Sequence, residues 1–144
     1  MNYSRILIIE DDKYILNFIS LSLKTSGYNF QCASTGLEGL SLFYSNKPDI
    51  VLLDLGLPDS DGIEIIKSIR EISECPIIVV SARGQEIDKI SINIDSGKIK
   101  LVKPDLTTFS SLITKYGIDK ITKANRVEEL YDQQKKDAND EFLV

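Results

Sequence analysis

The chain has 144 residues, 22 of them acidic and 17 basic, and it contains no histidine. This length fits one ordinary domain, or a small domain with a short appendage. The absence of histidine excludes a Ser-His-Asp or Cys-His nucleophile pair, a histidine-ligated zinc, and a phosphoryl-donating histidine within the chain. The net charge of -5 argues against a nucleic acid or an anionic membrane as a direct partner.

The two cysteines, Cys32 and Cys75, are too far apart in the sequence for a metal or redox motif. We expect both to be buried thiols in a reducing compartment, because small intracellular domains rarely use disulfides. No segment has the ~20 apolar residues of a membrane span, and the N-terminus lacks the apolar stretch of a signal peptide. A cytoplasmic location is therefore expected.

Short apolar runs alternate with helical patterns from the start of the chain. Residues 6–9 are predicted as a strand, and the apolar residues after it recur at helical spacing until Gly27, a natural stop. Residues 29–33 are predicted as a second strand. Ser34 and Thr35 can cap the helix that follows it.

The middle of the chain continues this alternation. Residues 50–54 form a predicted strand that is apolar until it ends on a carboxylate, and a loop rich in Gly, Pro and Asp follows it. Isoleucines at helical spacing predict a third helix over residues 63–69. Residues 77–81 are predicted as the fourth strand, and residues 84–95 as the fourth helix.

A fifth strand is predicted at residues 99–102, and a fifth helix at residues 106–116, closed by Gly117. Strands that are apolar throughout are typical of a parallel sheet covered by helices on both faces. The sequence therefore predicts an α/β fold, a doubly wound five-stranded parallel sheet. Residues 118–144 are expected to add an extra C-terminal helix or a mobile tail.

Polar side chains follow four of the predicted strands at the point where each strand ends. They are Glu10, Asp11, Asp54, Ser81 and Lys103. Because the carboxyl ends of parallel strands meet at one edge of the sheet, we expect these side chains to face one crevice.

Such a crevice has a definite chemistry. Carboxylates about 4 Å apart repel each other by roughly 4 kcal/mol at an effective dielectric constant near 20. A Mg²⁺ ion removes this conflict, because it binds one or two carboxylates together with waters and phosphate oxygens. Lys103 adds a positive charge for phosphate, and Ser81 adds a hydroxyl donor. Asp54 is the best candidate nucleophile for a phosphoryl group, whereas Asp12 is expected to be a turn former or helix cap.

These residues resemble the receiver domain of bacterial two-component response regulators. Glu10 and Asp11 match the acidic pair that binds Mg²⁺ in that family, and Asp54 in IVLLDLGLPDSDGIE matches the phosphoacceptor. Gly56 stands where the family uses a backbone carbonyl as a metal ligand. The resemblance implies a flavodoxin-like or CheY-like fold and a receiver domain over residues 1–117. As a departure from the family, we expect no recognisable effector domain in residues 118–144.

The resemblance extends to Ser81 in IIVVSAR, which matches the hydroxyl switch residue, and to Lys103, which matches the lysine of the Lys-Pro pair. The runs LDLGLPDSDGIE and SARGQEIDKI are especially similar to the potassium-transport regulators of the OmpR/PhoB class. The family implies a sensor histidine kinase as phosphoryl donor, a homodimer on phosphorylation, and control of transcription. It implies no enzyme activity beyond the chain's own phosphorylation and dephosphorylation.

The sequence departs from the family three residues before Lys103, where Lys100 replaces the usual aromatic residue. A receiver fold that binds a partner without phosphate is therefore an alternative hypothesis. Two other functions, an Asp-based phosphatase and a flavin-binding protein, fit the sequence less well. An Asp-based phosphatase needs an acid at the position of Gly56, and a flavin binder needs a phosphate-cradling loop where the acidic residues 10–12 would repel phosphate.

Overall fold

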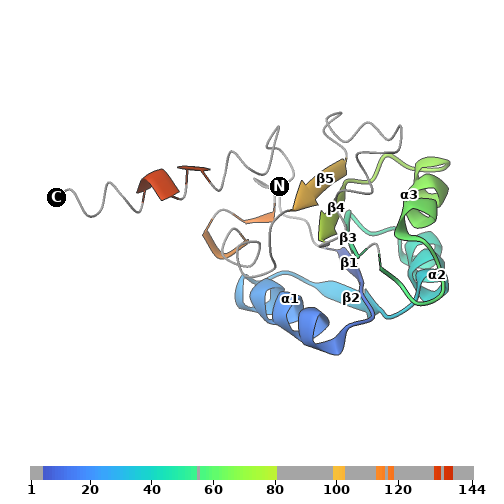
Figure 1. Ribbon diagram of the computed structural model, residues 1–144, viewed down its shortest axis with the longest axis horizontal. Helices are drawn as coiled ribbons and strands as arrows, with labels where there is room; N and C mark the ends of the chain where they lie inside the picture. The colour runs from blue at the N-terminus through green and yellow to red at the C-terminus, as the bar shows by residue number, and fades with distance from the viewer. Residues whose placement is uncertain are drawn as a thin grey trace.

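The computed structural model describes residues 5–54, 56–80, 99–102, 113–115, 117–118, 132–133 and 135–137. Five strands form one parallel sheet in the order β2-β1-β3-β4-β5 (Figure 1). The strands are β1 (Ile6–Ile9), β2 (Phe30–Ala33), β3 (Ile50–Leu53), β4 (Ile77–Val80) and β5 (Ile99–Val102). Within the described ranges, the longer helices are α1 (Lys13–Thr25), α2 (Gly36–Asn46) and α3 (Gly62–Arg70). The predicted parallel α/β fold is thus confirmed.

Helices cover both faces of this sheet, with α1 on one face and α2 and α3 on the other (Figure 1). Successive residues of a strand point to opposite faces, so each strand contributes to two cores. On the α1 face the strand residues are Ile6, Ile8, Ile50, Leu52 and Ile78. On the α2 and α3 face they are Leu7, Ile9, Ala33, Val51, Leu53, Ile77 and Val79. This double burial explains why β1 and β3 are apolar at every position.

The first helix begins at the residue expected to cap it. The Asp12 carboxylate accepts hydrogen bonds from the backbone N–H groups of Tyr14 (2.8 Å) and Ile15 (3.3 Å). Shortly after the last turn, Gly27 adopts a φ of 84°, a left-handed conformation that costs glycine little. Both ends of α1 therefore follow from local sequence signals.

Residues 113–115 are helical, and Ile113 and Ile118 pack on the α1 face. Gly117 has a φ of 82° and donates its N–H to the carbonyl of Ile113 at 2.9 Å. The next residue, Ile118, is fully buried in the same cluster as Ile113, and its N–H donates to the hydroxyl of Tyr28 at 3.0 Å. The packed core thus includes the first residue of the expected C-terminal extension, most of which lies outside the described residues, as does the helix expected at residues 84–95.

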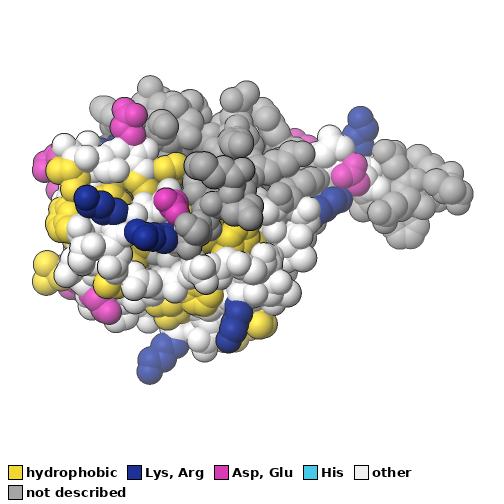
Figure 2. Space-filling view, turned by 180° about the vertical axis from the view of Figure 1, so that it is seen from behind, with side chains coloured by type: hydrophobic (Ala, Val, Ile, Leu, Met, Phe, Trp, Pro, Cys, Tyr) yellow, Lys and Arg dark blue, Asp and Glu magenta, His cyan; other side chains and the backbone are white. Residues whose placement is uncertain are grey.

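The surface and the thiols of the described residues are unexceptional. On the face opposite to that of Figure 1, basic and acidic side chains occur in small groups separated by hydrophobic and neutral ones (Figure 2). Cys32 and Cys75 are free, and each is half-buried, whereas we expected both to be buried.

Within the described ranges, no helix has the length and apolar character needed to cross a bilayer.

Gly39 lets helix α2 pack directly against the side chain of Ile9 in β1. A Cβ atom on Gly39 would lie 2.6 Å from Cδ1 and 2.9 Å from Cγ1 of Ile9. Ile9 is fully buried and is the last residue of β1, so its side chain has little room to move away. The glycine therefore sets the distance between α2 and the sheet.

We predict that Gly39→Ala lowers the net free energy of unfolding by about 1–2 kcal/mol, because overpacking against Ile9 costs about 2–3 kcal/mol. This cost should outweigh the gain of about 1 kcal/mol that alanine brings to a helix interior. Urea unfolding followed by circular dichroism measures the difference. Ser41→Ala, at an exposed position of the same helix, is the matched control and should be neutral or slightly stabilising. An equally stable Gly39→Ala variant would show that the close approach is not a constraint.

Candidate metal centre

The pairing of β1 with β3 brings two acidic residues to one edge of the sheet. Ile9 lies opposite Leu53 in the parallel register, so Glu10 and Asp54 leave their strands side by side. The N–H of Asp54 donates to the carbonyl of Ile9 at 3.0 Å. The N–H of Glu10 donates to the carbonyl of Ala33 at 2.9 Å. Sheet hydrogen bonds thus hold the backbone of both acidic residues.

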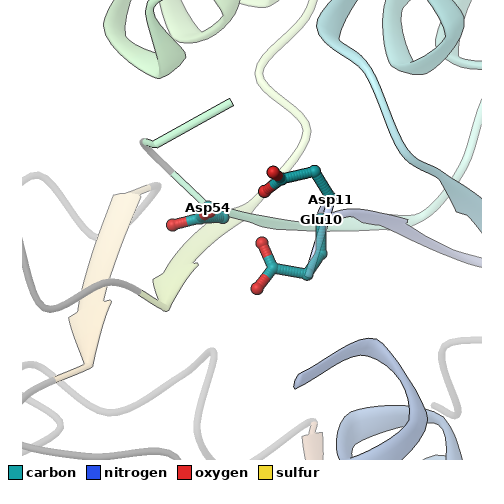
Figure 3. A group of neighbouring side chains, drawn as sticks. All are labelled: Glu10, Asp11 and Asp54. Atoms are coloured by element: carbon teal, nitrogen blue, oxygen red, sulfur yellow. The ribbon is translucent and has the colours of Figure 1, made fainter. Parts of the chain in front are cut away.

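Glu10, Asp11 and Asp54 form an acidic cluster at this edge. Each offers one carboxylate oxygen, and these oxygens all lie within 4.8 Å of one another. The carboxyl groups of Glu10 and Asp11 extend from the end of β1 towards the side where Asp54 lies (Figure 3). Glu10 is buried, Asp54 is half-buried and Asp11 is exposed, so the cluster is closed on one side and open to solvent on the other.

The Glu10 carboxyl group is the most perturbed member of the cluster. Only 2% of the residue is exposed, and among the described residues neither of its carboxyl oxygens has a hydrogen-bond partner. Burial, followed by the nearby Asp54 carboxyl and the charges of Asp11 and Asp12, raises the pKa of Glu10 from 4.5 to about 9. A buried carboxylate without partners is costly, and a divalent cation satisfies both its charge and its lone pairs.

The structure brings together three of the expected site residues and also describes a fourth. Gly56 is half-buried, two residues after Asp54 in the loop that leaves β3. Ser81 and Lys103 lie outside the described residues. In the sequence they directly follow Val80 and Val102, which are register partners at the same carboxyl edge of β4 and β5. Their expected roles therefore stay predictions.

Two further acidic residues after β3 have structural partners that the sequence reasoning missed. Asp61 is the N-cap of α3, and its carboxylate accepts from the N–H of Ile63 at 3.0 Å. An Asp followed by Gly and then by a stripe of isoleucines is a local signal that could have identified it. Asp59 contacts the start of α2 instead, more than twenty positions away in the sequence, and no local pattern indicates that contact.

The raised pKa of Glu10 gives a pH dependence to the protein without metal. Between pH 4.5 and about 9, folded Glu10 keeps a proton that the unfolded chain has released. Folding therefore becomes less favourable as the pH rises through this window, and the loss levels off above it. We predict that Glu10→Gln flattens this slope when unfolding is measured in EDTA at several pH values.

The matched control for this prediction is Glu64→Gln. Glu64 is an exposed residue of α3 outside the acidic cluster, so its loss should leave the slope as in the wild type. A Glu10→Gln variant with the wild-type slope would mean that another group causes the pH dependence.

Comparisons with known proteins agree with the fold described above. The family model of the response regulator receiver domain matches residues 6–105. A CheY-like receiver domain protein from Methanospirillum hungatei JF-1 superposes with a TM-score of 0.64 at 26% identity, covering 94% of this chain and 99% of the other. A sensor protein from Polaromonas sp. JS666 gives a TM-score of 0.64 at 27% identity, covering 81% and 97%.

The Mn²⁺-bound form of the response regulator Rcp1 has the same fold, with a TM-score of 0.64 at 22% identity over 80% of this chain and 95% of that one. The family model spans all five strands of the sheet and the acidic cluster at its edge. The chain therefore belongs to the family of response regulator receiver domains.

Proposed function

We propose that this chain is a phosphoacceptor switch of a two-component system. In this proposal Asp54 accepts a phosphoryl group from a phosphohistidine of a partner sensor histidine kinase. The observation that carries it is the acidic cluster, in which three carboxylate oxygens lie within 4.8 Å of one another. Its buried member, Glu10, has no hydrogen-bond partner for its carboxyl oxygens in the part of the chain that the structure describes. Receiver domains are signalling modules and not classical enzymes, so the chain acts on itself and on no external substrate.

The phosphoryl step uses the half-buried carboxylate of Asp54 as nucleophile. One of its oxygens forms a new P–O bond while the P–N bond to the donor histidine breaks, and the released imidazole keeps the electron pair. The product is an acyl phosphate on Asp54. Because this chain has no histidine, the donor must be a second protein or a small acyl phosphate.

The residues present fit a divalent cation. Glu10, Asp11, Asp54 and the backbone carbonyl of Gly56 are the proposed ligands. Hard carboxylate and carbonyl oxygens are the donors that Mg²⁺ and Mn²⁺ accept, and Rcp1, a protein of the same fold, is described in a Mn²⁺-bound form. A bound Mg²⁺ would neutralise the carboxylates and the charge on the phosphoryl oxygens. We assign Lys103 to the phosphoryl oxygens and Ser81 to the switch by their resemblance to the family.

The downstream output is proposed from the resemblance alone. The motifs around Asp54 and Ser81 support a regulator similar to the KdpE-type potassium-transport regulators of the OmpR/PhoB class, located in the cytoplasm and controlling transcription. Residues 1–117 are proposed as the receiver domain and residues 118–144 as an extension. Phosphorylation would favour a homodimer, although Lys100 at the usual aromatic position makes the switching face of this chain unusual.

The phosphoacceptor can be tested directly by mass. Wild-type protein incubated with Mg²⁺ and a small acyl phosphate should gain the mass of one phosphoryl group, and Asp54→Asn should gain none. The matched control is Asp12→Asn, because Asn caps a helix as well as Asp and this variant removes a neighbouring acid outside the cluster. It should be labelled like the wild type. Equal labelling of Asp54→Asn, or no labelling of folded wild type, would favour the phosphate-independent interaction module.

Metal binding can be tested by stability. At Mg²⁺ concentrations about 100 times the dissociation constant, the free energy of unfolding should rise by about 2.7 kcal/mol. In EDTA, Asp11→Asn should be more stable than the wild type by about 1 kcal/mol, because it removes one repelling charge at an exposed position. With Mg²⁺ the order should reverse, because the variant has lost a ligand. Urea unfolding in both buffers measures the crossover, and an Asp11→Asn variant that Mg²⁺ stabilises as much as the wild type would remove Asp11 from the site.

A further inference from the structure

The backbone N–H groups at the start of α2 donate hydrogen bonds to side chains from two different parts of the chain. The N-cap Thr35 accepts from the N–H of Glu38 at 3.1 Å, as an ordinary cap does. The carboxylate of Asp59, which lies between β3 and α3, accepts from the N–H groups of Gly36 at 2.7 Å and Leu37 at 3.1 Å. Each Asp59 oxygen takes one of these bonds, so the carboxylate bridges two successive backbone groups.

Packing reinforces this contact between the loop and the helix. A Cβ atom on Gly36 would overlap the side chain of Ser60 and would lie 2.9 Å from Cδ1 of Ile65. A glycine at position 36 is therefore needed for Ser60, the residue after Asp59, to lie directly against α2. The hydrogen bonds from Gly36 and Leu37 lower the pKa of Asp59, and a negative charge at a helix N-terminus is favourable.

The same loop carries the proposed phosphoacceptor and a proposed metal ligand. It leaves the sheet at Asp54, passes Gly56, buries Leu57 in the core against α2 and α3, and reaches the α3 cap at Asp61. Residues 56–60 form no helix or strand, so the backbone here lacks the hydrogen bonds of regular structure. Each residue ordered in this way costs about 1–2 kcal/mol of conformational entropy, which tertiary contacts must offset.

We infer that Asp59 is a positioning residue, which clamps the β3–α3 loop to the N-terminus of α2 and thereby sets the Gly56 carbonyl and the Asp54 carboxylate for metal binding and phosphoryl acceptance. This inference rests on the proposed function. Asp59 itself is not a ligand of the acidic cluster, and α2 has its own N-cap in Thr35. The contact with α2 therefore acts on the loop rather than only completing the helix.

The test compares two variants that act on the same helix end. Asp59→Ala removes both hydrogen bonds from the loop to α2. Thr35→Ala instead removes the cap hydrogen bond from the N–H of Glu38, which is made within this helix end, and costs the helix about 1 kcal/mol. The dissociation constant of Mn²⁺, measured from the electron paramagnetic resonance signal of the free ion, should rise about tenfold in Asp59→Ala, as for the loss of a group that supports metal ligands. In Thr35→Ala it should stay within about twofold of wild type, although this helix end is weakened.

Rescue by a conservative variant separates positioning from general instability. Asp59→Asn keeps one acceptor oxygen and should lie between wild type and Asp59→Ala in Mn²⁺ affinity and in the rate of labelling by a small acyl phosphate. If Asp59→Ala does not fold, Asp59→Asn is compared with Thr35→Ala instead. The expected losses of Mn²⁺ affinity and labelling rate are then smaller.

Three outcomes would overturn the inference or its basis. Wild-type Mn²⁺ affinity and labelling rate in both Asp59 variants would overturn the positioning role and leave the proposed function intact. Equal losses in the Thr35 and Asp59 variants would reduce Asp59 to a helix cap. A wild type that binds no Mn²⁺ and accepts no phosphoryl group would overturn the proposed function itself.

Discussion

The parallel pairing of β1 with β3 concentrates negative charge at one point of the molecule. Because Ile9 and Leu53 are register partners, the residues that follow them, Glu10 and Asp54, leave the sheet together. The strands are buried on both faces and hydrogen-bonded along their length, so the backbone cannot separate the two carboxyl groups without breaking the sheet. The repulsion is therefore fixed by the fold, and its relief requires a proton or a cation.

The three acidic residues of the cluster differ in exposure, in a way that fits their proposed roles. Glu10 lies under the sheet edge without a hydrogen-bond partner among the described residues, which suits a ligand that holds an ion in place. Asp11 is exposed at the rim, where an ion can enter from solvent. Asp54 is half-buried, so its carboxylate is held by the strand and can still meet a phosphoryl group on another molecule. This arrangement fits the proposed combination of a metal site with an accessible nucleophile.

The sequence predicted the features that depend on local patterns. The all-apolar strands indicated a doubly covered parallel sheet, and the caps at Asp12 and Thr35 followed from their residue types and positions. The acidic cluster could be predicted because parallel strands all end at one edge. The role of Asp59 could not, because its partners Gly36 and Leu37 lie 23 and 22 positions away and are backbone groups without a side-chain signature. The half-burial of the cysteines likewise depends on packing that no sequence pattern specifies.

Helix α2 supports the acidic cluster from outside the set of proposed ligands. Through Gly39 it packs against Ile9, the residue immediately before Glu10. Through the N–H groups of Gly36 and Leu37 it holds Asp59, in the loop that follows Asp54. One rigid helix thus contacts the backbone segments that carry both halves of the cluster. Because packed interiors transmit small displacements, loss of the Asp59 contact with α2 should alter metal binding without touching any ligand.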